Sequence, residues 1–322
     1  MREVTVMNDE AQRGLENLHN RPSVEAYPPV AIIVLSWNGL DDTVACLTSL
    51  RQISYPHFYV IVVDNGSTDG SPDKLARLFP EVVLLRREVN GGYAAGNNEG
   101  IRYAIDHGAD LILILNNDVV AEPGFLLPMV QEALSERAPG VVTCKALFQS
   151  DTRRVYCTGG HFSKWRCSGK PLSPALTSSV CEVEYVSGCI LLVRRSVFET
   201  VGLFDERFFM YCEDLEFSLR VRTRYPILYT PSGVVYHRSG GGSTWTDYTP
   251  TYLYYTTRNR FWVFRNERLW YRIYVFFYGL LNTLAKSGAL IARYGLRGKP
   301  GTGTSEKLGA LWRGFLHGVI TK

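Results

Sequence analysis

Two residues that could bind a metal ion each follow an apolar segment of the chain. Asp118 comes after the apolar run 111–115 and two asparagines, and His237 ends the segment Val235–His237. Carboxylates together with the oxygens of a diphosphate suit Mg²⁺ or Mn²⁺, and an imidazole can add a nitrogen ligand. We therefore predict a divalent metal site at Asp118 and His237. The alternatives are a capping role for Asp118 and a structural role for His237.

An acidic pair, Glu213-Asp214, has the chemistry for proton transfer. It opens a predicted helix and follows the run FFMY at residues 208–211. Apolar surroundings raise the pKa of a carboxylate and suit it to accept a proton from an alcohol. Leu215 and Leu219 share one face of this helix, which would fix its first turn against a core. Asp214 is the predicted base and Glu213 the competing candidate, although the first turn of any helix favours carboxylates.

Four polar loops supply candidate ligands for a nucleotide. They are SWNG (36–39), DNGSTDGS (64–71), NGGYAAGNNEG (90–100) and NNDV (116–119). Their glycines allow backbone to approach a ligand, and a helix N-terminus after the third loop would favour phosphate. Asp64 ends an apolar run, where it can accept hydrogen bonds from a base or ribose or serve as a turn residue. The candidate nucleotide-sugar-binding residues are Ser36, Asn38, Asp64, Asn65, Gly92, Asn97, Asn116 and Asn117.

Four apolar runs of strand length precede these loops, at residues 30–35, 59–63, 82–85 and 111–115. Apolar residues at helical spacing lie between them. Strands that alternate with helices predict right-handed βαβ units and an α/β fold with a mainly parallel central sheet. Ligands bind at the carboxyl ends of the strands in such sheets, so the four loops should meet at one edge. No G-x-G-x-x-G follows the first run and no P-loop motif occurs, which disfavours a dinucleotide cofactor and a P-loop triphosphatase.

The composition is that of an ordinary globular protein. The 322 residues are 46% hydrophobic and 20% charged, which excludes a disordered chain, a collagen and a long coiled coil. The seven cysteines contain no C-x-x-C pair, and their odd number favours reduced thiols in a cytosolic protein. A zinc site in the cluster from Cys144 to Cys189 is the alternative, but the spacings match no zinc finger. Residues 1–27 are polar and of mixed charge, and we expect a flexible leader.

The C-terminal region is strongly basic and rich in aromatic residues. Residues 258–322 contain 12 Lys and Arg against 2 Asp and Glu, a net charge of +10. The run 273–292 is just long enough to span a bilayer, but Lys286 lies inside it. We predict amphipathic helices on an anionic membrane surface and no nucleic-acid partner. Packing onto the rest of the chain, or onto a second subunit of a homo-oligomer, is the alternative.

Six stretches of the chain resemble the family 2 glycosyltransferases of the GT-A fold, and most closely their bacterial rhamnosyltransferase-type members. These stretches are VAIIVLSWNG, VDNGSTDGS, NGGYAAGNNEGI, LNNDV, SGCILLVRRSVFETVGLFDERFFMYCEDLEFSLR and VVYHRSGGGS. They span roughly residues 30–242, and YYTTRNR (254–260) is also similar to that group. The resemblance implies a GT-A catalytic domain over residues 28–242, followed by a basic, aromatic helical region over residues 243–322.

The resemblance also implies a role for each acidic residue. Asp64 matches the carboxylate that holds the base or ribose, and Asp118 matches the last position of the acidic D-x-D found in many relatives. Asp214 matches the catalytic base, and His237 matches a histidine that helps to bind the metal. The implied reaction is inverting sugar transfer from a nucleotide-diphosphate donor. The nearest resemblance favours dTDP-L-rhamnose, and UDP-sugars are the alternative.

The expected acceptor is a glycan or a polyprenyl-diphosphate-linked glycan used in cell-surface polysaccharide synthesis. Such an acceptor would place the enzyme in the cytoplasm, peripheral at the inner face of the membrane. A sugar-nucleotide pyrophosphorylase is a rival class, but it should carry Arg and Lys in an early glycine-rich loop, and SWNGLDD has neither. A non-catalytic scaffold that binds carbohydrate or lipid is the other rival, because a fold does not fix a function.

Overall fold

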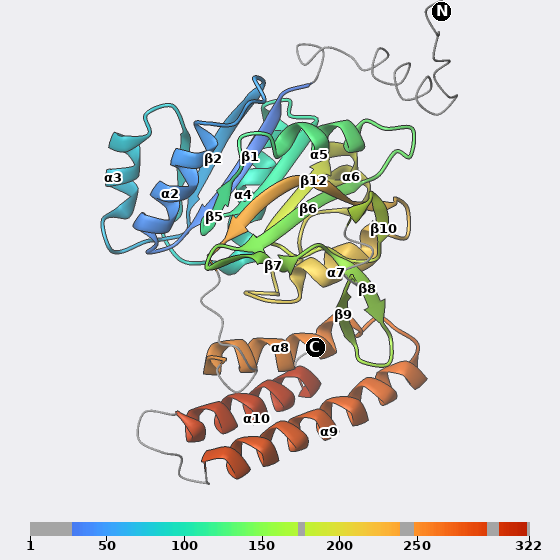
Figure 1. Cartoon of the computed structure of the whole chain (residues 1–322). Helices are drawn as coiled ribbons and strands as arrows, with labels where there is room; N and C mark the ends of the chain where they lie inside the picture. Colours follow the sequence, from blue (N-terminus) through green and yellow to red (C-terminus); the bar gives the residue numbers. More distant parts are fainter. Residues whose placement is uncertain (1–27, 173–177, 239–247, 295–302, 321–322) are drawn as a thin grey trace, which may run out of the picture.

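The computed structural model describes residues 28–172, 178–238, 248–294 and 303–320. The predicted leader and the glycine-rich loop after Arg238 lie outside these ranges. Figure 1 shows an α/β part with the helices α8, α9 and α10 packed together on one side of it. Within the described ranges, ten strands form the main sheet and two more form a small hairpin.

The first four strands are parallel and adjacent, in the spatial order β3-β2-β1-β4. They are β1 (Val30–Ser36), β2 (Phe58–Asp64), β3 (Val83–Arg86) and β4 (Leu111–Asn116). The helices between them are α2 (Leu40–Leu50), α3 (Ser71–Leu78) and α4 (Gly92–Asp106). These elements agree with the predicted runs to within one or two residues, because strands buried on both faces must be apolar throughout.

The second half of the chain extends this sheet with strands of both directions. The elements are β5 (Val119–Ala121), α5 (Leu126–Ala133), β6 (Val141–Phe148), β10 (Cys181–Val183), β11 (Ile190–Arg194), α6 (Arg195–Val201), α7 (Glu213–Val221) and β12 (Ile227–His237). Strand β11 lies antiparallel to both β4 and β6, whereas β12 is parallel to β6. The predicted α/β class is confirmed, and the sheet is mixed beyond β4.

Residues 149–183, in which the sequence shows no motif, contain short strands. They are β7 (Asp151–Cys157), β8 (Gly160–Ser163) and β9 (Ser168–Pro171), of which β8 and β9 pair as a separate antiparallel hairpin. Their side chains are largely polar and partly exposed, so they lack the apolar run of a central strand. This is why the sequence gives no signal for them.

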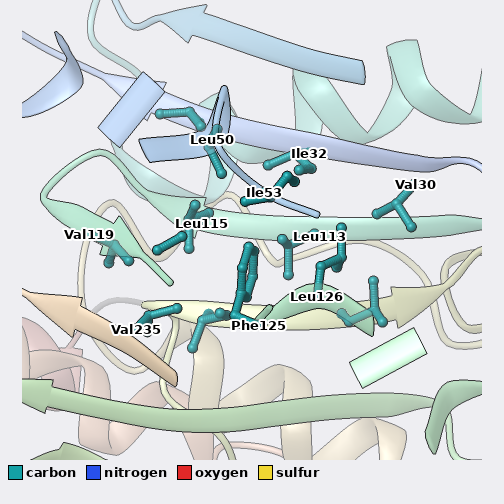
Figure 2. Packing of buried hydrophobic residues seen from close by; sticks show 14 of the residues in the cluster. Val30, Ile32, Leu50, Ile53, Leu113, Leu115, Val119, Phe125, Leu126 and Val235 are labelled. Atoms are coloured by element: carbon teal, nitrogen blue, oxygen red, sulfur yellow. The ribbon is translucent and has the colours of Figure 1, made fainter. Parts of the chain in front are cut away.

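The core lies on both faces of the sheet, and β1 contributes to each. Ile32 and Val34 pack in one cluster with residues of α2 and α5, part of which Figure 2 shows around Phe125. Ala31 and Ile33 point the other way, into a cluster with residues of α4, α6 and α7. Because the sheet is held on both sides, the loops at its edge rest on a rigid support.

The predicted C-terminal helical region is present as α8 (Pro250–Val263), α9 (Leu269–Tyr294) and α10 (Thr304–Ile320). Two glycines let α10 pack closely on α8: a Cβ at Gly314 would lie 2.5 Å from the carbonyl oxygen of Tyr254, and one at Gly318 would lie 2.9 Å from that of Arg258. In the described part of the chain, α9 is the one helix long and apolar enough to cross a membrane by length and composition.

Candidate functional site

The strand ends meet at one edge of the sheet, as the sequence predicts. The register places Ser36 opposite Asp64 and Leu35 opposite Asn116. The backbone N–H of Asn116 donates to the carbonyl of Cys189, just before β11 begins, at 3.1 Å. The loops after β1, β2 and β4 are therefore joined to the Ser187–Cys189 segment at a single edge.

Asp118 and His237 lie side by side at this edge. Asp118 Oδ1 is 3.4 Å from His237 Nε2, and the backbone N–H of Arg238 donates to the Asp118 carbonyl at 2.8 Å. The His237 ring stacks on Tyr156 with centroids 4.1 Å apart. Burial lowers the pKa of His237 to about 4 and raises the pKa of Asp118 to about 6. The imidazole is therefore neutral at pH 7, and its contact with Asp118 is not an ion pair.

This pair suits a divalent cation that also binds a ligand. A neutral imidazole offers a lone pair at Nε2, close enough to the carboxylate for both atoms to share one ion. Among the described residues, no group of three or more His, Cys, Asp or Glu side chains could hold a metal. Mg²⁺ and Mn²⁺ commonly take few protein ligands and complete their shell with phosphate oxygens and water. The donor set fits a metal held jointly by the protein and a diphosphate.

Asp214 is connected to the same edge by hydrogen bonds. Its Oδ2 accepts from the backbone N–H of Gly188 at 2.9 Å, and its Oδ1 accepts from that of Leu215 at 2.7 Å. Burial raises the pKa of Asp214, and these hydrogen bonds oppose the rise. Through Gly188 and Cys189, the carboxylate is attached to the segment that contacts Asn116. The predicted base is thus linked through the backbone to Asn116, two residues before the predicted metal ligand Asp118.

Glu213 has a different environment from its neighbour. It is 5% exposed, and its Oε2 has no hydrogen-bond partner in the ranges that the structure describes. Burial, with a smaller contribution from Asp214, raises the pKa of Glu213 well above its ordinary value. A protonated Glu213 would not compete as a base at neutral pH, which favours Asp214 as the proton acceptor.

A cavity of about 270 Å³ adjoins both carboxylates. Its walls come from the β8–β9 hairpin, the turn before α7, and α8. Three tyrosines, Tyr185, Tyr211 and Tyr252, and the cation Arg260 line it together with Glu213 and Asp214. The sequence did not predict this cavity, because its walls come from segments far apart along the chain.

Asp64 lies at the end of β2 and is 3% exposed. Its Oδ2 accepts from the backbone N–H of Ser67 at 3.3 Å, whereas Oδ1 lacks a partner within the described residues. Asn38 joins two loops: its N–H donates to Ser67 Oγ at 2.9 Å, and its Oδ1 accepts from the Thr68 N–H at 2.8 Å. The loops after β1 and β2 thus hold each other beside a buried carboxylate oxygen that has no hydrogen-bond partner among the described residues.

Asn65 and Gly92 hold the glycine-rich loop in place. Asn65 Nδ2 donates to Asn90 Oδ1 at 2.9 Å and to the Gly92 carbonyl at 3.0 Å, and Asn65 Oδ1 accepts from the Gly91 N–H at 3.1 Å. Gly92 has a φ of +84°, and a Cβ there would lie 2.1 Å from the carbonyl oxygen of Phe209. Protein packing alone therefore requires glycine at position 92, whatever ligand approaches the loop.

The other predicted nucleotide-binding residues are largely engaged with the protein. The Ser36 hydroxyl lies 2.9 Å from that of Thr43, to which Asn117 Nδ2 also donates at 3.0 Å. Asn97 is fully buried and donates to the Tyr93 carbonyl at 3.0 Å. Asn116 is an exception, because its Nδ2 lies at the edge that bears Asp118 and His237, 3.4 Å from His237 Nε2.

A family model described as glycosyl transferase family 2 matches residues 31–202, just over half of the chain. The chain belongs to this family. As a family 2 glycosyltransferase it is an enzyme of the hexosyltransferase type, which removes the pyrophosphorylase and scaffold alternatives. The matched segment ends before Glu213, Asp214 and His237.

Curated relatives of this family 2 glycosyltransferase include several rhamnosyltransferases. The chain is 30% identical over 249 residues to the N-acetylglucosaminyl-diphospho-decaprenol L-rhamnosyltransferase of Mycobacterium tuberculosis, over 67% of this chain and 80% of the relative. It is 27% identical over 247 residues to the dTDP-rhamnosyl transferase RfbF of Shigella flexneri, over 74% and 80% of the two chains. The O-antigen biosynthesis protein RfbC of Myxococcus xanthus is 34% identical over 221 residues, or 63% of this chain, but these span 17% of the relative.

Solved structures of low sequence identity share the fold of this glycosyltransferase. The mannosyltransferase PcManGT of Pyrobaculum calidifontis, in complex with GDP-Man and Mn²⁺, has a TM-score of 0.58 at 16% identity and covers 97% of this chain and 94% of its own. GalNAc-T7, with UDP, GalNAc and Mn²⁺, has a TM-score of 0.60 at 16% identity and covers 75% and 49%. The GT-A fold predicted from the sequence is confirmed.

Proposed function

We propose that this enzyme is an inverting rhamnosyltransferase that transfers L-rhamnose from dTDP-L-rhamnose to a lipid-linked glycan. The observation that supports the proposal is that Asp214 lines the cavity and also accepts a hydrogen bond from Gly188, next to the residue that binds Asn116. In this proposal the proton acceptor and the metal ligands form one site. The rhamnosyltransferases among the relatives support the choice of sugar.

In the proposed reaction, a hydroxyl of the acceptor enters the cavity and gives its proton to Asp214. The hydroxyl oxygen attacks the anomeric carbon from the face opposite the nucleotide, while the bond from that carbon to the diphosphate breaks. Asp64 would hold the base or ribose, and Asp118 and His237 would hold a divalent metal. When bound, the metal stabilises negative charge on the diphosphate. Fixed placement of donor and acceptor supplies much of the rate.

The cavity beside Asp214 has the chemistry of an acceptor site. Aromatic rings give flat apolar surfaces against which sugar rings pack, and three tyrosines line this cavity. Arg260 adds a cation that can pair with the phosphate of a polyprenyl-diphosphate-linked acceptor. A lipid-linked glycan therefore fits the lining better than a neutral, soluble sugar.

A panel of nucleotide-sugars tests the proposed donor. With Mg²⁺ or Mn²⁺ and acceptor present, nucleoside diphosphate release is expected to be fastest with dTDP-L-rhamnose. UDP-sugars are the alternative. Faster release of nucleoside diphosphate from any of them would overturn the proposed donor, but the protein would still be a sugar transferase. The Asp64→Ala variant is the control, because it should bind the nucleoside diphosphate weakly in calorimetry while keeping the melting temperature of the wild type.

We further propose that α9 lies on an anionic membrane surface. Its buried residues recur about every four positions and face the protein. The opposite face is apolar and exposed, with Phe277 57% and Leu281 65% accessible to solvent. This apolar face of α9 comprises Leu269, Trp270, Ile273, Phe277, Leu281 and Leu284. A helix that has one apolar face open to solvent and basic residues around it is typical of proteins that bind the membrane interface.

The β8–β9 hairpin extends the same surface. Its connecting segment contains the exposed run Lys164-Trp165-Arg166, in which Trp165 is 75% exposed. The Trp165 and Tyr274 rings are in edge contact at 5.7 Å, which places this run beside α9. Trp together with Lys and Arg is favoured at the boundary between lipid headgroups and water. The hairpin and α9 thus offer one membrane face, and the enzyme would lie at the cytoplasmic side of the membrane.

Two charges on the apolar face of α9 should release the protein from membranes. Full burial of a Phe or Leu side chain is worth about 1.5–3 kcal/mol, so Phe277→Glu with Leu281→Glu should lower binding to anionic liposomes by at least about tenfold. Sedimentation measures the bound fraction. Leu134→Glu, at an exposed apolar residue next to α5, is the matched control and should bind as the wild type does. Equal sedimentation of all three proteins would mean that this face does not contact lipid.

A further inference from the structure

The turn before the acidic pair has an unusual backbone. Tyr211 and Cys212 both have a φ of +68°, although neither is glycine. Side chains with a Cβ rarely adopt this left-handed conformation, and two in succession persist only where the surroundings enforce them. Glu213 and Asp214 follow at once as the first residues of α7. The direction of the Asp214 carboxylate therefore depends on what holds this turn.

Asn259 of α8 holds it. Its side chain is fully buried, and its Nδ2 donates to the Met210 carbonyl at 2.9 Å and to the Tyr211 carbonyl at 2.6 Å. Its Oδ1 accepts from Arg258 Nε at 2.8 Å, which fixes the orientation of the amide. Both ends of the amide group are thus engaged, and both donor hydrogens are directed at the turn.

Asn259 is itself held by its helix. The Arg258 guanidinium lies 3.9 Å from the Trp262 ring centroid, and α10 packs closely against α8 at Gly314 and Gly318. The Tyr255 ring of the same helix stacks on Phe209, just before the turn, at 5.5 Å. Helix α8 is therefore fixed from both sides, so the amide of Asn259 is a rigid support.

We infer that Asn259 is a positioning residue for sugar transfer, which acts through the Tyr211-Cys212 turn to aim Asp214 at the acceptor. The inference rests on the proposed role of Asp214 as base. It gives a function to the YYTTRNR stretch, whose similarity to relatives does not by itself indicate a role. Loss of Asn259 should lower kcat rather than weaken donor binding, because the donor residues are at the ends of β2, β4 and β12.

Asn259→Leu tests this role, since leucine has a similar size but donates no hydrogen bond. Asn98→Leu is the matched control. Asn98, on α4, is also buried, and it donates to the Phe204 carbonyl at 2.9 Å and accepts from the Phe204 N–H at 3.1 Å. It also donates to Glu206 Oε1 at 3.0 Å, and none of these bonds reaches the Tyr211-Cys212 turn. Both variants lose buried hydrogen bonds to backbone, so both should lose similar thermal stability. Only Asn259→Leu should change the turn.

Cys212 reports on the turn without any need for activity. Cys212 is half-buried and lines the cavity, but desolvation, with smaller contributions from Asp214 and Glu213, raises the pKa of its thiol to about 12, so iodoacetamide should modify it slowly in the wild type. In Asn259→Leu, mass spectrometry should show Cys212 alkylated at least about tenfold faster, because the turn opens locally. In Asn98→Leu the rate should equal that of the wild type. Equal Cys212 labelling in all three proteins would overturn the inference.

Kinetics then connect the turn to catalysis. Misplacement of a reacting group by about 1 Å can lower a rate by ~10²-fold. The kcat of Asn259→Leu should therefore fall by roughly ten- to a hundredfold, whereas its Kd for the donor should not change. A kcat loss equal to that of Asn98→Leu would reduce Asn259 to a stabilising residue. If the wild type transferred no sugar at all, the proposed function would fail, whereas Cys212 labelling would still decide whether Asn259 holds the turn.

Discussion

Replacement of Asp214 by asparagine is expected to lower the rate of sugar transfer by about 10²–10⁴ while donor binding persists. Asparagine keeps the size of the side chain and can still accept from the Gly188 N–H, but it cannot take a proton at neutral pH. The nucleotide should remain bound, because Asp64 and Asp118 lie at the ends of other strands. Transfer kinetics measure the rate of each protein, and calorimetry measures its affinity for the nucleoside diphosphate.

Glu213→Gln is the necessary companion, since Glu213 also lines the cavity. Its raised pKa predicts a protonated side chain, which glutamine imitates, so this variant should retain most of its activity. The wild-type rate should fall as the pH drops through the pKa of Asp214, which burial places above the usual aspartate value. If Glu213→Gln transferred no sugar while Asp214→Asn kept the wild-type rate, Glu213 would be the base and Asp214 would not.

Chelation of the metal should abolish transfer. Excess EDTA is expected to stop turnover, and Mg²⁺ or Mn²⁺ should restore it, because the metal would balance the charge of a departing diphosphate. Asp118→Asn should raise the Mn²⁺ concentration needed for half-maximal rate, and it should weaken Mn²⁺ binding measured directly by electron paramagnetic resonance in the presence of nucleoside diphosphate.

Asp106→Asn is the control for the metal experiment, because Asp106 is exposed at the end of α4 and lies outside the site. Its metal dependence should equal that of the wild type. Full activity in excess EDTA would show that the reaction needs no metal, and Asp118 and His237 would then be reassigned to contacts within the protein.

The sequence predicts which loops meet at the edge proposed to bind the donor, because the positions of these loops depend on local patterns. Each of the strands β1, β2 and β4 is an uninterrupted apolar run, and its polar loop follows directly. Parallel strands bring such loops to one edge, so the amino-acid pattern alone is enough to place Asp64 and Asn116 together. The contact of Asp118 with His237 follows from the same rule, once β12 is known to end there.

The proposed acceptor half could not be predicted in this way. Its cavity combines the hairpin segment at Cys167–Gly169, the turn at Tyr211 and the helix around Tyr252, and no periodicity links these segments. Neither of the two successive left-handed residues, Tyr211 and Cys212, is a glycine, so the sequence does not indicate this turn. The hydrogen bond from Asn259 crosses 48 positions of sequence, which only the tertiary structure can reveal.

The hydrogen bonds of Asn259 also bear on the order in which the enzyme matures during its synthesis. Chains fold from the N-terminus as they leave the ribosome, so the strands with Asp64 and Asp118 at their ends emerge well before α8. A nascent chain could therefore hold a nucleotide-sugar before Asn259 fixes the turn ahead of Asp214. In the proposed mechanism, sugar transfer would begin only when α8 and α10 have packed, which also completes the proposed membrane face at α9. If both proposals hold, newly made enzyme would not consume donor before a lipid-linked acceptor is within reach.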